Sequence, residues 1–174
     1  YLRLTTRRVF QLQRQIDSDL ETAIIDGGYW LRAPAPGAQL VIAYVGAVGP
    51  DALSAHTKII DEIPGVGLLA VTSPDRLYRA WLAAQRQRQA TVNGPEAAIE
   101  RLLAPLEASS RIVTVVDGHP SILSWLGAVY GHPVRALGVE RYGESGSLSE
   151  LYEAYHLDSD SIIRACTETH QPAA

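Results

Sequence analysis

Short apolar segments alternate with amphipathic ones from Gln39 onward, and this alternation constrains the fold more than any other feature. The apolar segments cover residues 40–45, 67–71, 112–116 and 134–139, and such continuous hydrophobicity is typical of strands covered on both faces. Segments with helical spacing of apolar residues lie between and after them. The pattern predicts an α/β three-layer sandwich, with a mostly parallel, mixed sheet of about five strands and helices on both faces.

Capping residues mark where several of these helices begin. Ser147 with Glu150 has the spacing of a capping box, and Ser18 with Glu21 has the same spacing near the start of the chain, where the pair Gly27-Gly28 is expected to end the helix. Asp158 stands where it would cap the last helix. A single helix is expected over residues 120–130, with apolar positions almost all the way round, and we therefore expect it to be buried on more than one side.

The first part of the chain differs from the rest and is expected to be a connector. Residues 1–6 are rich in β-formers, and the proline-rich segment 33–37 can continue neither a helix nor a central strand. We place the boundary there, with a connector over 1–33, leading out of a preceding domain, and the α/β domain over 34–174. The sequence contains no methionine and begins as if within a strand, so we expect a piece of a longer protein, shortened by design or by proteolysis.

Composition excludes several classes of partner. The formal net charge of −4 argues against nucleic-acid binding, and Arg86 and Arg88 are interpreted as the solvated end of a helix. Cys166 is the single cysteine, so neither an internal disulfide nor a cysteine zinc site can form. No segment has the length of a membrane span and no secretory signal is recognised, which favours a cytoplasmic protein without membrane contact.

Motifs that would identify an enzyme are absent from the sequence. It has no phosphate-binding glycine loop and no Gly-x-Ser-x-Gly nucleophile elbow, and its five histidines lack metal-ligand spacing, so no metal site is expected. Asp117, Gly118 and His119 form the first candidate site, because they follow an apolar strand and precede a helix N-terminus that favours an anion. The alternative is that Asp117 or His119 only caps that helix or lines a contact between domains.

A glycine-rich loop after the last strand is the second candidate. Gly143 and Gly146 permit a tight turn, and Arg141 can bind a carboxylate or phosphate through two hydrogen bonds. Ser145 lies within the same loop. The alternative is a well-packed loop in which Arg141 pairs with a neighbouring carboxylate.

These segments resemble the C-terminal domain of transketolase-like, thiamine-diphosphate-dependent enzymes. Residues 138–146 carry the family's arginine, aromatic residue and Gly-x-Ser-Gly, and the helices at 150–152 and 162–163 are similar too. The strand and turn at 115–119, before an apolar helix, also look like that family. The connector, with its Gly27-to-Leu31 segment, is most similar to the homodimeric decarboxylating component of pyruvate dehydrogenase.

The resemblance implies that catalysis resides in other domains of a parent enzyme. There, thiamine diphosphate and magnesium bind between two domains whose motifs this chain lacks, so no cofactor is expected here. The fragment alone is expected to be inactive, in an oxidoreductase of the pyruvate dehydrogenase type or, as the alternative parent, a transketolase. Its implied partners are the remaining parent domains, a second subunit of a homodimer, and a lipoyl acyltransferase core. No residue is assigned to catalysis, although His119 is the best candidate to reach the substrate channel.

Two other classes of function compete with this interpretation. A free-standing regulatory module would bind an anionic metabolite at residues 117–120. An independent hydrolase is disfavoured because no pair of nucleophile and base is recognised in the sequence.

Overall fold

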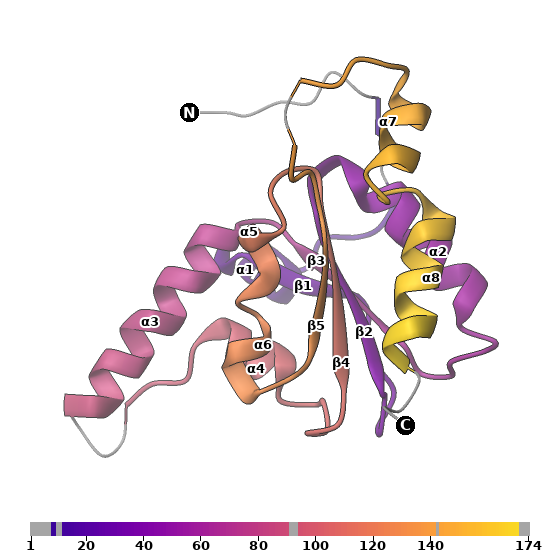
Figure 1. Cartoon of the computed structure of the whole chain (residues 1–174). Helices are drawn as coiled ribbons and strands as arrows, with labels where there is room; N and C mark the ends of the chain where they lie inside the picture. Colours follow the sequence, from indigo (N-terminus) through magenta and orange to yellow (C-terminus); the bar gives the residue numbers. More distant parts are fainter. Residues whose placement is uncertain (1–7, 10–11, 91–93, 142, 171–174) are drawn as a thin grey trace.

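The parallel strands expected from the apolar segments form one mixed sheet in the computed structural model (Figure 1). It describes residues 8–9, 12–90, 94–141 and 143–170, so the expected strand at 1–6 lies outside the described residues. In these residues the sheet has five strands in the order β1-β3-β2-β4-β5. The strands are β1 (Gly28–Arg32), β2 (Leu40–Val45), β3 (Gly67–Val71), β4 (Arg111–Val116) and β5 (Val134–Leu137). The α/β class is confirmed.

Helices cover both faces of the sheet, as the alternation predicted. One face packs against α2 (Gly49–Ile59), α7 (Leu148–Ala154) and α8 (Ser159–His170). The other face packs against α3 (Pro74–Ala90), α4 (Ala98–Leu103), α5 (Ser121–Ser124) and α6 (Gly127–Tyr130). Figure 1 shows these two groups on opposite sides of the strands, with α3 extending away from them. A short 3-10 turn, η1 (Gly46–Val48), connects β2 to α2.

Strand β2 lies at the centre of the sheet and pairs in parallel with both β3 and β4. Its side chains alternate between the faces, as the two-residue period of a strand requires. Leu40 and Ile42 enter the core beneath α2 and α8. Val41 and Ala43 enter the core beneath α3 and α4. The apolar run is continuous because each of its residues faces one of two buried layers.

The connector supplies both a helix and the edge strand of the sheet. Helix α1 (Ser18–Asp26) ends at Gly27, whose φ of 114° closes the helix in the left-handed region, as expected from the Gly-Gly pair. Strand β1 then pairs antiparallel with β3. The N-cap of α1 is Asp17, which accepts a hydrogen bond from the Leu20 amide at 2.8 Å, so the expected cap at Ser18 was wrong by one residue. The division at residue 33 stays a prediction.

The single helix expected over residues 120–130 is wrong, because the segment forms the two short helices α5 and α6. The Trp125 indole N–H donates to the carbonyl of Ile122 at 2.9 Å, where a continuous helix would accept the Leu126 amide. The Leu126 amide instead bonds to the carbonyl of Leu123, one residue closer. The expected burial on several sides is also wrong at Tyr130, which is 47% exposed.

The basic end of α3 is not wholly solvated. Arg88 forms an ion pair with Glu100, whose side chain is 8% exposed, and its guanidinium also donates to the carbonyl of Pro95 at 2.9 Å. Arg86 is exposed, in agreement with the expectation. Removing the Glu100 carboxylate would leave Arg88 without its buried partner, so we interpret this arginine as a structural residue that fixes α3 against α4.

His56 should make folding stability depend on pH. It lies on α2, is 3% exposed, and its Nε2 lies 3.0 Å from the carbonyl of Val66. Burial lowers the pKa of His56 below its usual value, although the bond to Val66 opposes this shift. The unfolded chain therefore takes up more protons as the pH falls below about 6.5, and the free energy of unfolding should decrease from pH 7.5 to 5.5.

Urea titrations of the wild type and of His56→Gln across that range measure the effect. The variant should lose the part of the pH dependence that His56 supplies. His119→Gln, at an exposed histidine, is the matched control and should keep it. Identical pH dependence in the His56 variant and the wild type would contradict the assignment.

Cys166 offers a second test of the packing. It lies in α8 with no exposed surface, and burial raises the pKa of its thiol to about 12. Because the thiolate is the reactive form, Ellman's reagent at pH 8 should react with the folded chain only as fast as the chain opens. The reaction should become immediate in denaturing urea. Rapid labelling of the folded protein would show that α8 does not pack as described.

Candidate functional site

Both candidate loops of the sequence lie at the carboxyl ends of β4 and β5, where they border a cavity of about 390 Å³. This is the edge of an open parallel sheet at which ligands bind. Of the candidate residues, Asp117, Arg141 and Ser145 line the cavity together. Its remaining walls are contributed by Val139, Gly143, Glu144, Leu148, Leu151, Tyr152, Tyr155 and Leu157. The structure thus brings into one cavity two segments that were separate candidate sites in the sequence.

A close backbone crossing holds the two loops together. The Val139 amide donates to the carbonyl of Gly118 at 2.7 Å. A Cβ atom on Gly138 would lie 2.6 Å from that carbonyl oxygen and 2.8 Å from Cδ of Pro120, which real Cβ atoms do not tolerate. Glycine is therefore required at position 138 by the contact between the loops. Gly118 acts through its backbone in this crossing.

The arginine loop is fixed by contacts with the helix that follows it. The Tyr155 hydroxyl donates to the carbonyl of Arg141 at 2.7 Å. The capping box expected at α7 is confirmed, because the Ser147 amide donates to Oε2 of Glu150 at 2.8 Å and the Ser147 side chain accepts from the Glu150 amide. Hydrogen bonds from Ser147 hold the pKa of the Glu150 carboxyl below its usual value. Gly143, with a φ of 102°, makes the turn between these anchors.

His119 does not line this cavity. Its ring is exposed, its Nδ1 lies 2.7 Å from the hydroxyl of Ser121, and the same atom accepts from the Ser121 amide at 3.3 Å. These contacts place it at the start of α5, which agrees with the capping alternative. Its proposed reach into a substrate channel stays a prediction.

The charges around the cavity are mixed. The Arg141 guanidinium shares the walls with the carboxylates of Asp117 and Glu144. A site selective for an anion would present cations or backbone amides with no carboxylates beside them. The mixture of charges in this cavity therefore gives no support to the regulatory, anion-binding alternative. A rim with both signs of charge and an exposed apolar residue, Leu148, is more typical of a protein contact.

Sequence reasoning missed a larger cavity of about 790 Å³ at the carboxyl ends of β2 and β3. Its walls come from the connector as well as from β2 and α2. No sequence motif indicates this cavity, because its lining residues, mostly apolar and hydroxyl side chains with Arg14 and Lys58, are scattered over residues 9–72. The one signal was the rule that ligands bind at this edge of the sheet.

Comparisons with known proteins find a match in shape but not in sequence. No protein-family profile matches the chain, and no curated protein does. Among solved structures, transketolase from Leishmania mexicana matches with a TM-score of 0.58 at 20% identity, over 85% of this chain and 18% of that one. The fold is that of a transketolase domain.

Two further transketolases match in the same way. The enzyme from Campylobacter jejuni has a TM-score of 0.58 at 15% identity, over 82% of this chain and 18% of that one. A split gene transketolase, described as an inactive β4 tetramer, has a TM-score of 0.57 at 16% identity, over 83% of this chain and 42% of that one. The chain thus spans less than half the length of the transketolases it matches.

Neither a membrane span nor a cluster of metal ligands is found in the described part of the chain. None of its helices is long and apolar enough to cross a bilayer. No three His, Cys, Asp or Glu side chains come together there as a metal site would need.

The close contact at Gly138 predicts that alanine substitutions at two glycines of one loop differ sharply in their effect on stability. Gly138→Ala should lower the free energy of unfolding by about 2 kcal/mol, because the new methyl group would collide with the backbone of Gly118 and Pro120. Gly146→Ala is the control, since its Cβ would meet only ordinary contacts with Glu150 and Leu151, and it should change stability by less than about 0.5 kcal/mol. Urea unfolding measures both. Equal effects would contradict the crossing.

Proposed function

We propose that this chain is the C-terminal domain of a thiamine-diphosphate-dependent enzyme, where it supports the dimer and the entrance to the active site. The observation that carries the proposal is the unequal coverage: the match takes in 85% of this chain and only 18% of the transketolase from Leishmania mexicana. One domain of a larger enzyme would give that result. The glycine-rich segment at 138–146, whose Gly138 is required by the loop crossing, supports the same interpretation.

Within this proposal, the parent is a 2-oxo-acid dehydrogenase of the pyruvate dehydrogenase type. The similarity of the connector supports this choice, and its Gly27 is required structurally because a Cβ there would lie 2.8 Å from the carbonyl oxygen of Ser73. The parent would pass its acyl group to lipoyl groups of an acyltransferase core. A transketolase is the alternative parent, and the matched solved structures agree with it.

The described residues do not fit the cofactor itself. A magnesium diphosphate needs several oxygen ligands around the metal, and no three acidic or histidine side chains come together in the described residues. The cavity at β4 and β5 presents one cation, Arg141, beside the carboxylates of Asp117 and Glu144, which would repel a diphosphate. The cofactor would therefore bind to other domains of the parent, and no catalytic step is assigned to this chain.

The edge formed by the two candidate loops is the surface proposed to contact the rest of the enzyme. Leu148, which lines the cavity, is 43% exposed, and Leu151 and Tyr155 line the same cavity. Charges of both signs flank these apolar residues. Such a surface pairs well with another protein surface, because apolar contact supplies affinity and the charges fix the orientation.

Calorimetry with thiamine diphosphate and MgCl₂ tests the proposal. The chain alone should release no binding heat, whereas a longer protein that includes the coding sequence upstream of Tyr1 should bind both and form a dimer. In the longer protein, Leu148→Asp should weaken the dimer about tenfold by sedimentation, because it places a charge in an apolar contact. Ile60→Asp, at another exposed apolar residue, is the matched control and should leave the dimer unchanged. Saturable cofactor binding by the chain alone would refute the proposal.

A further inference from the structure

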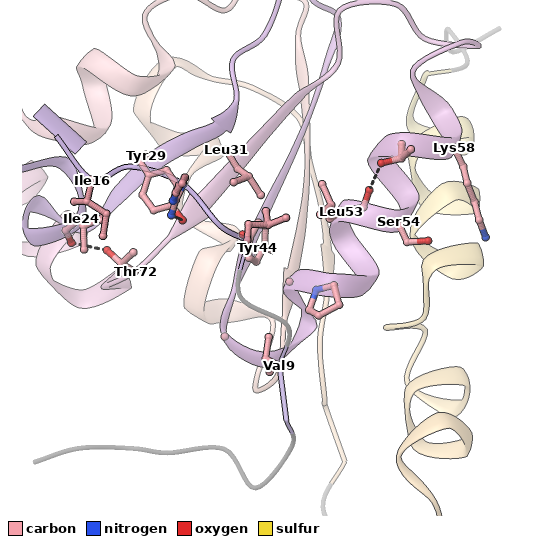
Figure 2. A pocket seen from close by; sticks show the side chains of 16 residues that line it. Val9, Ile16, Ile24, Tyr29, Leu31, Tyr44, Leu53, Ser54, Lys58 and Thr72 are labelled. Atoms are coloured by element: carbon pink, nitrogen blue, oxygen red, sulfur yellow. Dashed lines mark hydrogen bonds between the residues drawn. The ribbon is translucent and has the colours of Figure 1, made fainter. Parts of the chain in front are cut away.

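The larger cavity lies on the opposite half of the sheet edge from the candidate loops. It opens where β2 and β3 end, between the connector with its strand β1 and one side of α2 (Figure 2). Its volume of about 790 Å³ falls within the range of small-molecule sites. It also occupies the crevice at strand ends where open parallel sheets bind ligands.

Tyr44 lies at the centre of this cavity and contributes a hydroxyl group to its lining (Figure 2). A Cβ on Gly49 would lie 2.9 Å from the Tyr44 ring, so the glycine at the start of α2 makes room for the ring in this position. Burial, assisted by the neighbouring Tyr29, raises the pKa of Tyr44 to about 12. Its hydroxyl therefore remains protonated at neutral pH and is a suitable donor to a ligand oxygen.

The walls around Tyr44 are largely apolar and partly open to solvent. Ile24 and Leu31 line one side, and Leu53 of α2 lines the other. Ile16 is 63% exposed at the border of the cavity, an unusual degree of exposure for isoleucine. A ligand with an apolar body would cover this surface and gain the free energy of removing it from water.

The charged residues of the cavity have one sign. Among the described residues its lining includes Arg14 and Lys58 but no aspartate or glutamate, in a chain whose net charge is −4. Lys58 already pairs with Asp160 at 2.9 Å. The Arg14 guanidinium lies 4.3 Å above the ring of Tyr29 and donates to its hydroxyl. A guanidinium has five N–H donors, so Arg14 retains donors for a second acceptor.

From this combination we propose that the cavity binds an amphipathic monocarboxylate, with its apolar body against Leu31 and Leu53 and its carboxylate on Arg14. Tyr29 fixes the guanidinium, so that it can meet a carboxylate through two parallel hydrogen bonds. Both parts of the ligand are needed, because the apolar walls bind its hydrocarbon chain and Arg14 selects its carboxylate head group. The site lies apart from the loops invoked in the proposed function and does not depend on it.

Calorimetry with octanoate as the probe tests this site directly in the chain as it stands. Octanoate should bind saturably, and hexanoate should bind about tenfold more weakly because it buries two fewer methylene groups. 1-Octanol, the uncharged match in chain length, should also bind about tenfold more weakly, since it lacks the charge that Arg14 recognises.

Variants then assign the parts of the cavity. Arg14→Gln should weaken octanoate about tenfold and leave octanol unchanged, whereas Leu53→Asp should weaken both ligands. Arg79→Gln is the matched control, because Arg79 is exposed on α3 far from the cavity and should bind octanoate like the wild type. Circular dichroism verifies that each variant is folded.

Three results would overturn the proposal. They are the absence of saturable octanoate binding, equal affinity for octanoate and octanol, and unchanged octanoate affinity in Arg14→Gln. If octanoate fails to bind and Leu53→Asp instead disrupts a contact with another protein, the cavity is a protein contact and the ligand proposal is wrong. Because no cofactor is present in these measurements, their outcome is separate from that of the thiamine diphosphate titration.

Discussion

The parallel pairing of β2 with both β3 and β4 is the constraint on which the rest of the structure depends. Parallel neighbours cannot be joined by hairpins, so each connection must cross the sheet as a helix or extended segment. The connections leave on both faces, which buries residues 40–43 of β2 and divides the core into two layers. Together with the parallel pairing of β4 and β5, this arrangement brings the carboxyl ends of four strands to one edge, and both cavities lie there.

Features governed by local chemistry could be predicted from the sequence. The runs around Ile42, Leu68 and Val113 indicated buried strands because each residue faces an apolar layer. The helix cap at Ser147 and the helix end at Gly27 could be predicted because each forms hydrogen bonds with backbone groups only a few residues away. The fold class followed from the order of these elements.

Features governed by distant contacts could not be predicted in the same way. The break between α5 and α6 depends on a hydrogen bond from the Trp125 indole N–H to a backbone carbonyl. The periodicity of apolar residues does not reveal such a bond. β1 consists mostly of half-buried residues, and its place in the sheet depends on β3, some 40 positions later. For the candidate site, Asp117, Arg141 and Ser145 were identified, but their common cavity required the crossing at Gly138. The cavity around Tyr44 needed the full three-dimensional arrangement.

The contact between Gly118 and Gly138 holds the loops after β4 and β5 together. The strand-end loops of β4 and β5 share a backbone hydrogen bond and leave no room for a side chain between them. The arginine loop is tied in turn to α7 through the Tyr155 hydroxyl. A surface assembled in this way presents a fixed shape, which suits a role in holding domains together better than a role that requires a mobile lid.

The antiparallel pairing of β1 has a consequence for where this protein can be divided. Without β1, the hydrogen-bonding groups along one edge of β3 would face solvent beside the buried, apolar residues Leu68 and Leu69. Such an edge is a template for pairing with other chains and promotes aggregation. A protein that began at the proline-rich segment would therefore keep most of its core but expose an unpaired strand edge that is prone to aggregation. The connector thus covers this edge of β3 within the sheet.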